Sequence, residues 1–316
     1  MRIAIIGGGS WGTALGVHLA KKNHQIKIWE FFAEQAKEMQ EQRTCRLLPE
    51  VKLPEQIYVC SDLELTLKDS EAVLVVVPSD KVEVTLKNAA SFIQEQPVIL
   101  CSKGFASGQR LLSDVVQSHV KGNVYCLYGP THAEEVCKGM FTGIVLAGKK
   151  GKERTQLKKA LEHDDFRVEA SEDLIGVQVA AALKNILAIF IGVLDGLQLG
   201  DNSKAYVMTK GLGDIRTLGV ALGAKKETFY SLAGMGDLIV TCSSKHSRNR
   251  HVGEQIGKGR MLDEVLAEMK MVSEGVTNAK EAVLLQKKLG LHLPLISGLH
   301  EILFEGKSAK EVLKKI

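Results

Sequence analysis

The chain has 316 residues, of which 45% are hydrophobic and 25% charged, and its formal net charge is +4. This length is sufficient for two domains with separate hydrophobic cores, and the composition is ordinary for a soluble globular protein. The positive charge is small and spread along the chain. It argues against a nucleic-acid partner but would help to attract an anionic small-molecule ligand.

The cysteines and histidines indicate a reduced protein without a metal centre. The six cysteines form no C-x-x-C pair, and several lie in apolar runs, as buried free thiols do. None of the nine histidines has an H-x-x-x-H or comparable ligand spacing. Residues 1–6 lead directly into a strand and a turn, so we expect no signal peptide. We therefore predict a cytoplasmic protein that binds no metal.

Apolar periodicity divides the chain into two halves. In the first half, β-branched runs alternate with helical patterns, which predicts strands at 3–6, 26–29, 73–77, 98–101, 124–128 and 144–147, with helices at 11–22 and 81–92. Near-continuous apolar strands predict a parallel sheet covered on both faces. From about residue 172 only helical patterns remain, at 176–197, 204–222 and 277–289. We predict an α/β Rossmann-type doubly wound domain over residues 1–177 and an all-α domain over residues 178–316.

The glycine-rich turn after the first strand fits two different enzymes. Gly7-x-Gly9-x-x-Gly12 is a dinucleotide fingerprint, whereas the overlapping Gly8-x-Ser10-x-Gly12 is the pattern of a hydrolase nucleophile elbow. A nucleophile elbow needs an oxyanion donor from an earlier loop, and only six residues precede Gly7. Each glycine that a dinucleotide-binding turn requires is present. Gly7 permits the turn, Gly9 lets the backbone approach a pyrophosphate, and Gly12 allows close packing of the helix.

Glu30 lies at the end of the second predicted strand, eighteen residues after Gly12. Dinucleotide-binding domains carry a carboxylate near this position that accepts a hydrogen bond from the ribose. Such a carboxylate repels the 2′-phosphate of NADP, and the surrounding "WEFFAEQ" contains no lysine or arginine. We therefore favour NADH over NADPH. The alternative is that Glu30 is only a polar residue at a strand end.

The apolar segment at residues 177–194 contains one formal charge, Lys184. The segment barely reaches the length of a transmembrane helix, and its charge lies at the centre, where a membrane span tolerates it least. We therefore predict a buried core helix and no membrane span. A lysine there must be ion-paired or have a lowered pKa, which suits acid–base catalysis. The alternative is that Lys184 extends its amine to the helix surface.

Two further polar segments could hold an anionic substrate. Lys103 in "CSKGF" follows a predicted strand, where open α/β sheets bind their ligands. Residues 234–253 bring polar side chains around a helix start, namely Asp237, Arg248, Asn249 and Arg250. This predicts an anion site or, alternatively, a solvated basic turn.

Eight ordered motifs between residue 3 and about residue 306 make the chain resemble the bacterial-type NAD(P)-dependent sn-glycerol-3-phosphate dehydrogenases. They are "GGGSWGTALG", "VPS", "SKG", "GPTHAEEV", "ALKNILA", "DGLQLGDNSKA", "GMGDLIVTCSSKHSRN" and "MVSEGV". The resemblance implies reversible hydride transfer between NAD(P)H and dihydroxyacetone phosphate, which gives sn-glycerol 3-phosphate for glycerophospholipid synthesis. We also expect a homodimer, because an all-helical second domain often supplies a dimer interface.

The resemblance implies roles for individual residues. Lys184 is the proton donor to the forming alkoxide, Lys103 contacts both substrate and cofactor, and Asp237 lies near the catalytic amine. The implied substrate-binding residues are Lys103, Gly129, Thr131, Lys184, Asp237, Ser247, Arg248 and Asn249. With the glycine turn and Glu30 included, the cofactor-binding residues are Gly7, Gly9, Ser10, Trp11, Gly12, Glu30, Lys103, Ala133, Arg248, Val272 and Glu274.

The chain departs from the family pattern in three places. Family members usually carry His or Arg just after the Trp of the second strand, which favours NADPH, but this chain reads Glu30–Phe31–Phe32. Tyr128 replaces a serine before "GP", so the loop near the substrate is expected to pack differently. The usual "RGLAE" reads "KGLGD" at residues 210–214, a change that the sequence does not explain.

Two other functions stay open at this point. A lysine-dependent dehydrogenase of the 6-phosphogluconate or 3-hydroxy-acid type shares a buried lysine and asparagine, but the "SRN" and "GMGD" segments argue against it. A non-catalytic NAD-sensing protein would be expected to lack Lys184 or Arg248, and both are present.

Overall fold

The computed structural model describes residues 1–244, 247–269 and 273–316, which form two compact units. The N-terminal unit consists of residues 1–102 and 112–174, and the helical unit consists of residues 103–111 and 175–316. The main division falls between residues 174 and 175. The helical unit, however, also takes a short segment from the first half of the chain.

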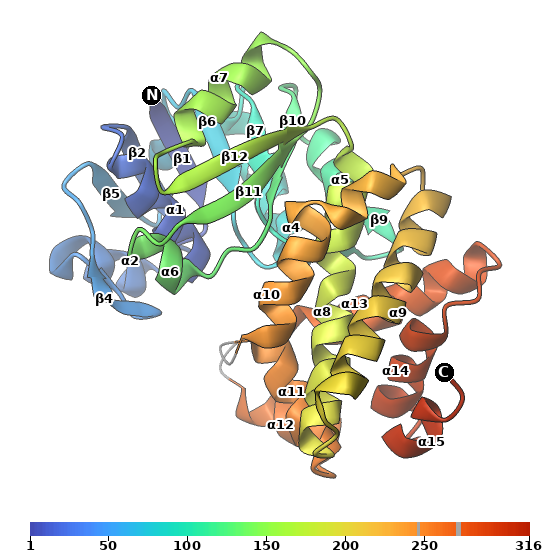
Figure 1. Ribbon diagram of the computed structural model, residues 1–316. Coiled ribbons are helices and arrows are strands. Elements are labelled where there is room, and N and C mark those ends of the chain that lie inside the picture. Colours follow the sequence, from blue (N-terminus) through green and yellow to red (C-terminus); the bar gives the residue numbers. More distant parts are fainter. Residues whose placement is uncertain (245–246, 270–272) are drawn as a thin grey trace. The chain divides into compact units, whose positions relative to one another are not determined.

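The N-terminal unit is built on one large β-sheet (Figure 1). Its strands lie in the order β12-β11-β10-β7-β6-β1-β2-β5, and all neighbours are parallel except β10 and β11. The order from β5 to β10 is that of a Rossmann fold, whose direction reverses between β1 and β6, so the predicted fold class is confirmed. The strands are β1 (Arg2–Ile6), β2 (Gln25–Trp29), β5 (Ile57–Cys60), β6 (Ala72–Val75), β7 (Val98–Leu100), β10 (Val124–Tyr128), β11 (Thr142–Ala147) and β12 (Phe166–Ser171).

The strand prediction needs two corrections. It lacks the two edge strands: β12 alternates apolar and polar residues, and β5 is an apolar run of only four residues. It also expects only parallel strands, whereas β11 runs antiparallel to β10. Between them lies only the five-residue helix α6 (Ala133–Cys137), which is too short for the crossover that parallel neighbours need. β11 and β12 are parallel because the longer α7 (Lys152–Leu161) connects them.

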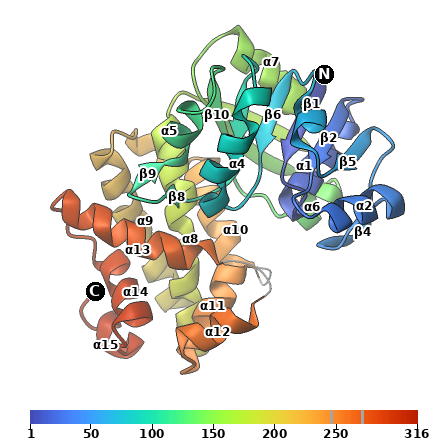
Figure 2. The same ribbon diagram turned by 180° about the vertical axis from the view of Figure 1, so that it is seen from behind.

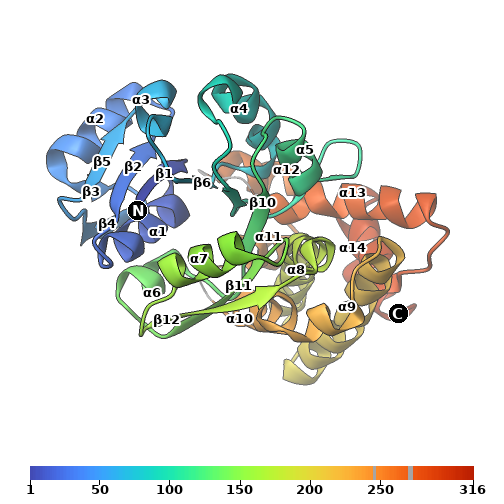
Figure 3. The same cartoon turned by 90° about the horizontal axis from the view of Figure 1, so that it is seen from above.

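Helices cover both faces of the sheet. Figure 3 shows α3, α4 and α5 on one side of the strands and α1, α6 and α7 on the other. The apolar side chains of α1, α2, α6 and α7 form one core with those of the strands beneath them. Bounds not yet given are α1 (Ser10–Ala20), α2 (Ala33–Gln42), α3 (Leu63–Leu67), α4 (Val82–Ala89) and α5 (Leu112–Gln117), with a small hairpin of β3 (Thr44–Cys45) and β4 (Leu48–Lys52).

The helical unit is arranged around α8 (Leu174–Gly196), which both Figure 1 and Figure 2 show among the other helices. Every residue from Gly176 to Leu194 is buried. The other elements are β8 (Phe105–Ala106), β9 (Arg110–Leu111), α9 (Asp201–Ala221), α10 (Asp237–Ser243), α11 (Arg248–Gly257), α12 (Leu262–Glu268), α13 (Glu274–Lys288), α14 (Pro294–Phe304) and α15 (Ala309–Leu313). By length and composition α8 could cross a membrane, but 89% of its apolar window is buried, as in the core helix of a folded protein.

Glycines allow two helices to approach the backbone of α8 closely. A Cβ atom at Gly192 would overlap the Arg250 carbonyl, and a Cβ atom at Gly253 would overlap the Ile189 carbonyl, so α8 and α11 pack backbone to backbone. A Cβ atom at Gly211 would overlap the Leu187 side chain, so this glycine seats α9 against α8. These close approaches fix the start of α11 relative to Lys184 on α8.

The structure gives a role to Asp214, the last residue of the "KGLGD" segment at residues 210–214. Helix α14 begins after Leu293, which has no side chain able to cap the helix. Asp214, on α9, supplies the cap instead: its Oδ2 accepts hydrogen bonds from the backbone N–H of Leu295 at 2.9 Å and of Ile296 at 3.4 Å. A carboxylate at a helix N-terminus pairs with otherwise unbonded amides and is favoured by the helix dipole.

We expect Asp214→Ala to lower the free energy of unfolding by about 1–2 kcal/mol, because the partly buried amides at the start of α14 lose their acceptor. Urea denaturation followed by circular dichroism measures this change. Asp201→Ala is the matched control on the same helix, because the Asp201 side chain is 99% exposed. Equal stability of the two variants would contradict the capping role.

Candidate active site

The glycine-rich turn joins β1 to α1 at the point where the strand order reverses. Gly7 has a φ of 123°, and a Cβ atom there would lie 2.9 Å from the Val76 carbonyl at the end of β6. A Cβ atom at Gly12 would overlap the Gly7 carbonyl. Gly9 differs, because a Cβ atom there would meet no atom within 4 Å. Gly7 and Gly12 therefore serve packing, whereas Gly9 faces open space at a helix N-terminus, where a pyrophosphate fits.

The start of α1 also presents a buried hydrogen-bond donor. Ser10 is the first residue of α1 and Trp11 the second. The Trp11 Nε1 atom is buried and has no acceptor within the part of the chain that the structure describes. A buried donor is costly when it has no acceptor, so this atom fits a ligand with acceptor oxygens. Two observations therefore fit the turn to a dinucleotide: the open space beside Gly9 and the unpaired N–H of the Trp11 ring among the described residues.

Glu30 lies against this turn at the end of β2. A Cβ atom at Gly8 would come within 2.6 Å of Glu30 Oε2, and Oε1 accepts a hydrogen bond from the Phe32 N–H at 3.2 Å. Burial raises the pKa of the Glu30 carboxyl, and backbone hydrogen bonds from Phe32, Gly8 and Phe31 oppose this shift. The structure thus brings Glu30 to the glycine turn, beside the exposed side chains of Phe31 and Phe32.

The segment after β10 carries three further predicted residues. Gly129 packs against β11, because a Cβ atom there would lie 3.0 Å from the Gly143 carbonyl. Thr131 Oγ1 donates a hydrogen bond to the Gly129 carbonyl at 3.1 Å, and Ala133 begins α6. Tyr128, the unusual residue before "GP", is buried, and its hydroxyl donates to the Ser102 carbonyl at 2.7 Å. The larger side chain therefore fills the interior of the N-terminal unit.

Two lysines converge on one carboxylate inside the helical unit. Lys184 Nζ donates hydrogen bonds to Asp237 Oδ1 and, at 2.7 Å, to Thr241 Oγ1. Lys103 Nζ donates to the other carboxylate oxygen, Asp237 Oδ2, at 2.8 Å. Asp237 is 1% exposed and Lys184 is 6% exposed, so the alternative in which Lys184 reaches the helix surface is wrong. The sequence places these three charged residues far apart, and the fold brings them into contact.

Burial lowers the pKa of Lys184 to about 8. Desolvation disfavours the charged amine, Asp237 opposes that effect, and the positive charge of Lys103 adds to it. The Cys242 thiol, also buried close to this cluster, has its pKa raised to about 12, again by desolvation. Lys184 therefore can exist as either ammonium or amine near neutral pH, as a general acid–base group requires.

The backbone before Asp237 positions its carboxylate. Residues Leu232–Gly236 form a π-helical turn that leads directly into α10, and such turns are frequent at functional sites. Thr241 lies one helical turn after Asp237, so both face Lys184. Sequence reasoning missed Thr241, although the Asp-x-x-x-Thr spacing on one helix face was a usable signal.

The predicted phosphate-binding residues begin α11. Ser247 is the N-cap, and its hydroxyl accepts a hydrogen bond from the Arg250 N–H at 3.3 Å. Asn249 Oδ1 accepts from Ser273 Oγ at 2.7 Å and from the Gly275 N–H at 3.0 Å, which joins the start of α11 to that of α13. Arg248 is the first residue of α11, and Glu274 is the first of α13. Val272 lies outside the described residues.

Arg250 has a different environment from Arg248. Its Nε atom donates to Asp195 Oδ2 at 2.6 Å, and Lys204 Nζ lies 2.6 Å from the other oxygen of the same carboxylate. These two cations lower the pKa of Asp195, although burial opposes them. Arg250 thus connects α11 to the end of α8. The residues at the start of α11 that could contact a ligand are Ser247, Arg248 and Asn249.

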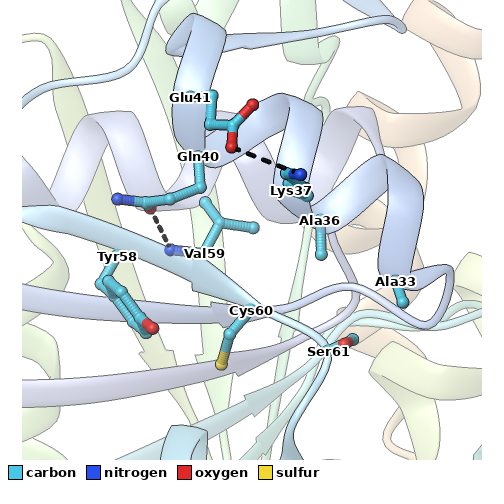
Figure 4. Close-up of a pocket in the computed structure, with 9 residues that line it drawn as sticks. All are labelled: Ala33, Ala36, Lys37, Gln40, Glu41, Tyr58, Val59, Cys60 and Ser61. Atoms are coloured by element: carbon cyan, nitrogen blue, oxygen red, sulfur yellow. Dashed lines mark hydrogen bonds and ion pairs between the residues drawn. The ribbon is translucent and has the colours of Figure 1, made fainter.

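A pocket of about 260 Å³ lies in the N-terminal unit between α2 and β5 (Figure 4). It is lined by Ala33, Ala36, Lys37, Gln40, Glu41, Tyr58, Val59, Cys60 and Ser61. Gln40 Oε1 accepts a hydrogen bond from the Val59 N–H, and Lys37 pairs with Glu41 at 3.9 Å. None of the predicted site residues lines this pocket.

Comparison with known proteins identifies the family. Residues 2–154 match the N-terminal model of NAD-dependent glycerol-3-phosphate dehydrogenase, and residues 173–314 match its C-terminal model. The chain belongs to the NAD-dependent glycerol-3-phosphate dehydrogenase family. The resemblance inferred from the eight motifs is therefore confirmed.

Relatives of this family match over nearly their whole length. Glycerol-3-phosphate dehydrogenase [NAD(P)+] of Fusobacterium nucleatum is 38% identical, and the match covers 100% of this chain and 96% of the relative. The enzyme of the same name from Geobacillus thermodenitrificans is 41% identical, and the match covers 99% of this chain and 94% of the relative. The crystal structure of glycerol-3-phosphate dehydrogenase from Coxiella burnetii is similar with a TM-score of 0.95, at 34% identity, covering 99% of this chain and 98% of that one.

We expect Gly9→Ala to weaken NADH binding at least about tenfold while leaving the thermal stability nearly unchanged, because the added methyl group enters the open cradle. NADH fluorescence titration and thermal unfolding measure the two effects. Gly213→Ala is the control, because a Cβ atom there also meets no atom within 4 Å but lies on α9. NADH affinity that is the same in both variants would show that the cradle does not hold the pyrophosphate.

Proposed function

We propose that this chain catalyses the reversible NAD(P)-dependent reduction of dihydroxyacetone phosphate to sn-glycerol 3-phosphate. The observation that carries the proposal is the buried Lys184–Asp237–Lys103 cluster, in a chain of the glycerol-3-phosphate dehydrogenase family. Lys184 and Arg248 are both retained, which speaks against a non-catalytic NAD-sensing protein. The family assignment likewise speaks against a 6-phosphogluconate-type dehydrogenase.

Lys184 acts as the acid–base group in this proposal. When NAD(P)H is bound, it supplies the hydride that adds to C2 of the ketone. Negative charge then develops on the C2 oxygen, and the Lys184 ammonium stabilises this charge and donates a proton to it. Thr241 and Asp237 hold the amine by its other hydrogens, so its position is set before the substrate arrives. In the oxidation direction the neutral amine accepts the proton from the C2 hydroxyl.

The substrate phosphate is assigned to the start of α11. Backbone amides at a helix N-terminus and a guanidinium together form a strong anion site, and Ser247, Arg248 and Asn249 lie there. Holding the phosphate away from the reacting carbon orients the ketone, and this remote binding energy lowers the barrier at C2. Gly129 and Thr131 are proposed to border the substrate.

The cofactor is assigned to the glycine turn, with the adenosine ribose at Glu30. The carboxylate lies against the turn and is close enough to the Gly8 and Phe32 backbone to be held in place. A fixed carboxylate accepts hydrogen bonds from ribose hydroxyls and repels a 2′-phosphate, which supports a preference for NADH. Lys103, Ala133, Arg248, Val272 and Glu274 complete the proposed cofactor contacts.

The product and the cysteines support two broader assignments. sn-Glycerol 3-phosphate is a precursor of glycerophospholipids, so we assign the enzyme to lipid metabolism. The free cysteines support a cytoplasmic location, and none of the six is in a disulfide. We further propose a homodimer, which analytical ultracentrifugation would test.

We expect Lys184→Ala to lower kcat for dihydroxyacetone phosphate at least about 1,000-fold while NADH binding is retained, because only the proton donor is lost. Steady-state kinetics and NADH titration separate these effects. Lys210→Ala, an exposed lysine on α9, is the control and should keep normal turnover. Near-normal turnover of Lys184→Ala would remove the acid–base assignment.

The pH dependence follows from the lowered pKa of Lys184. Reduction needs the ammonium form, so kcat for reduction should fall as pH rises through about 8. Oxidation needs the neutral amine, so kcat for oxidation should rise over the same range. Profiles measured in both directions check the prediction, and two profiles that change in the same direction near pH 8 would contradict it.

We expect kcat/KM to be at least about tenfold higher with NADH than with NADPH, because Glu30 repels the 2′-phosphate. Glu30→Gln should narrow this ratio by improving NADPH use. Glu34→Gln, a change at an exposed carboxylate in the first turn of α2, should leave the ratio unchanged. Equal use of both cofactors by the unmodified enzyme would show that a basic group from elsewhere reaches the ribose.

A further inference from the structure

Asn278 is a buried amide on α13 whose side chain bridges two other elements of the helical unit. It is 1% exposed. Its Oδ1 atom accepts a hydrogen bond from the Phe105 N–H at 3.3 Å, and its Nδ2 atom donates to the Ala182 carbonyl at 3.0 Å. The Phe105 amide can only donate and the Ala182 carbonyl can only accept, so the partners fix the orientation of the amide. A buried polar side chain with both groups paired this way specifies one arrangement of its neighbours.

The two bridged residues are next to the two catalytic lysines. Phe105 lies two residues after Lys103, and Ala182 lies two residues before Lys184. One amide therefore connects the segment that carries Lys103 to the helix that carries Lys184. The Phe105 side chain is buried in the same apolar core as α8, which supports the connection.

The segment carrying Lys103 needs such a connection because it has little structure of its own. Strands β8 and β9 contain two residues each, and a hairpin of that size is not stable alone. Gly104, with a φ of 149°, separates Lys103 from Phe105 and adds backbone freedom. A second contact, from the Gln109 N–H and side chain to Glu281 Oε2 at 3.2 and 3.1 Å, holds the far end of the hairpin on α13.

We propose that Asn278 is a positioning residue for catalysis: it ties the Lys103 segment to α8 and so sets the placement of Lys103 beside Asp237 and Lys184. This inference rests on the proposed function, because it takes both lysines to be catalytic. Within the described residues, Asn278 forms its hydrogen bonds with Phe105 and Ala182 and not with either lysine. Its effect reaches the site through the backbone at Phe105 and Ala182.

Loss of the two Asn278 hydrogen bonds is expected to change the pKa of Lys184. The titratable groups that act on Lys184 are Asp237 on α10 and Lys103 on the hairpin segment, and the Cys242 thiol on α10 is close by. If Lys103 moves away, its repulsion of the Lys184 ammonium falls and Asp237 is shared with one cation fewer. Both changes raise the pKa of Lys184. A purely structural role for Asn278 would leave that pKa where it is.

The experiment compares Asn278→Leu with Asp214→Ala in the full-length enzyme. Leucine keeps the shape of asparagine but forms neither hydrogen bond, while Asp214→Ala destabilises the helical unit at α14, away from Lys103. We expect Asn278→Leu to move the basic limb of the kcat–pH profile for reduction upward by about half a unit, a roughly threefold change in the acid dissociation constant. We also expect a higher KM for dihydroxyacetone phosphate and an unchanged KM for NADH. Asp214→Ala should keep the wild-type profile.

Amide hydrogen exchange gives a readout that needs no substrate. The Phe105 N–H should exchange at least about tenfold faster in Asn278→Leu than in wild type, and should be unaffected by Asp214→Ala. If Asn278→Leu does not fold, Asn278→Ser, whose shorter side chain cannot reach both partners, serves in its place. A wild-type pH profile together with wild-type exchange at Phe105 would overturn the inference. An unmodified enzyme that fails to reduce dihydroxyacetone phosphate would instead refute the proposed function, while the exchange result still decides whether the tie exists.

Discussion

The buried carboxylate of Asp237 holds together the two lysines of the candidate active site. Its two oxygens accept hydrogen bonds from two lysine side chains, one from Lys103 and one from the buried Lys184. Two lysines around one carboxylate leave an excess of formal positive charge, which would stabilise the alkoxide of the proposed reaction. The same burial that makes the arrangement costly lowers the pKa of Lys184 into the working range.

The rest of the helical unit can be understood as support for that cluster. The π-helical turn aims Asp237, glycine contacts bring α11 against α8, and Asn249 joins the starts of α11 and α13. Helix α13 then contacts the hairpin that carries Lys103. Most of these contacts use backbone groups as partners, so they depend on the path of the chain more than on the identity of individual side chains.

Much of the fold and part of the site could be predicted from the sequence, because local pattern carries that information. The apolar runs of β1, β6 and β10, the glycine fingerprint and the charge within α8 are each visible in a short window of residues. Strand β12 was missed because its residues alternate between apolar and polar, and β5 because its apolar run has only four residues. The reversed direction of β11 was missed because strand direction depends on the length of the connection. The contact of Lys103 with Asp237 spans 134 residues and has no local signature.

The departures from the family pattern illustrate the same limit. Tyr128 and Asp214 are unexplained in a linear sequence because their partners, the Ser102 carbonyl and the first amides of α14, lie elsewhere in the chain. Thr241 differs from these two residues, because its four-residue spacing from Asp237 is visible in the sequence. Only its contact with Lys184 requires the folded structure. A resemblance can name the chemistry of such residues, but the pairing that makes them useful is a property of the folded chain.

Residues 103–111 belong to the helical unit although the chain on either side of them belongs to the N-terminal unit. The boundary is therefore crossed three times, and the two units are not consecutive stretches of the gene. A fragment that starts at residue 175 would lack both a core side chain, Phe105, and one of the two lysines. The core of the helical unit is therefore completed by a segment that is synthesised long before the rest of that unit.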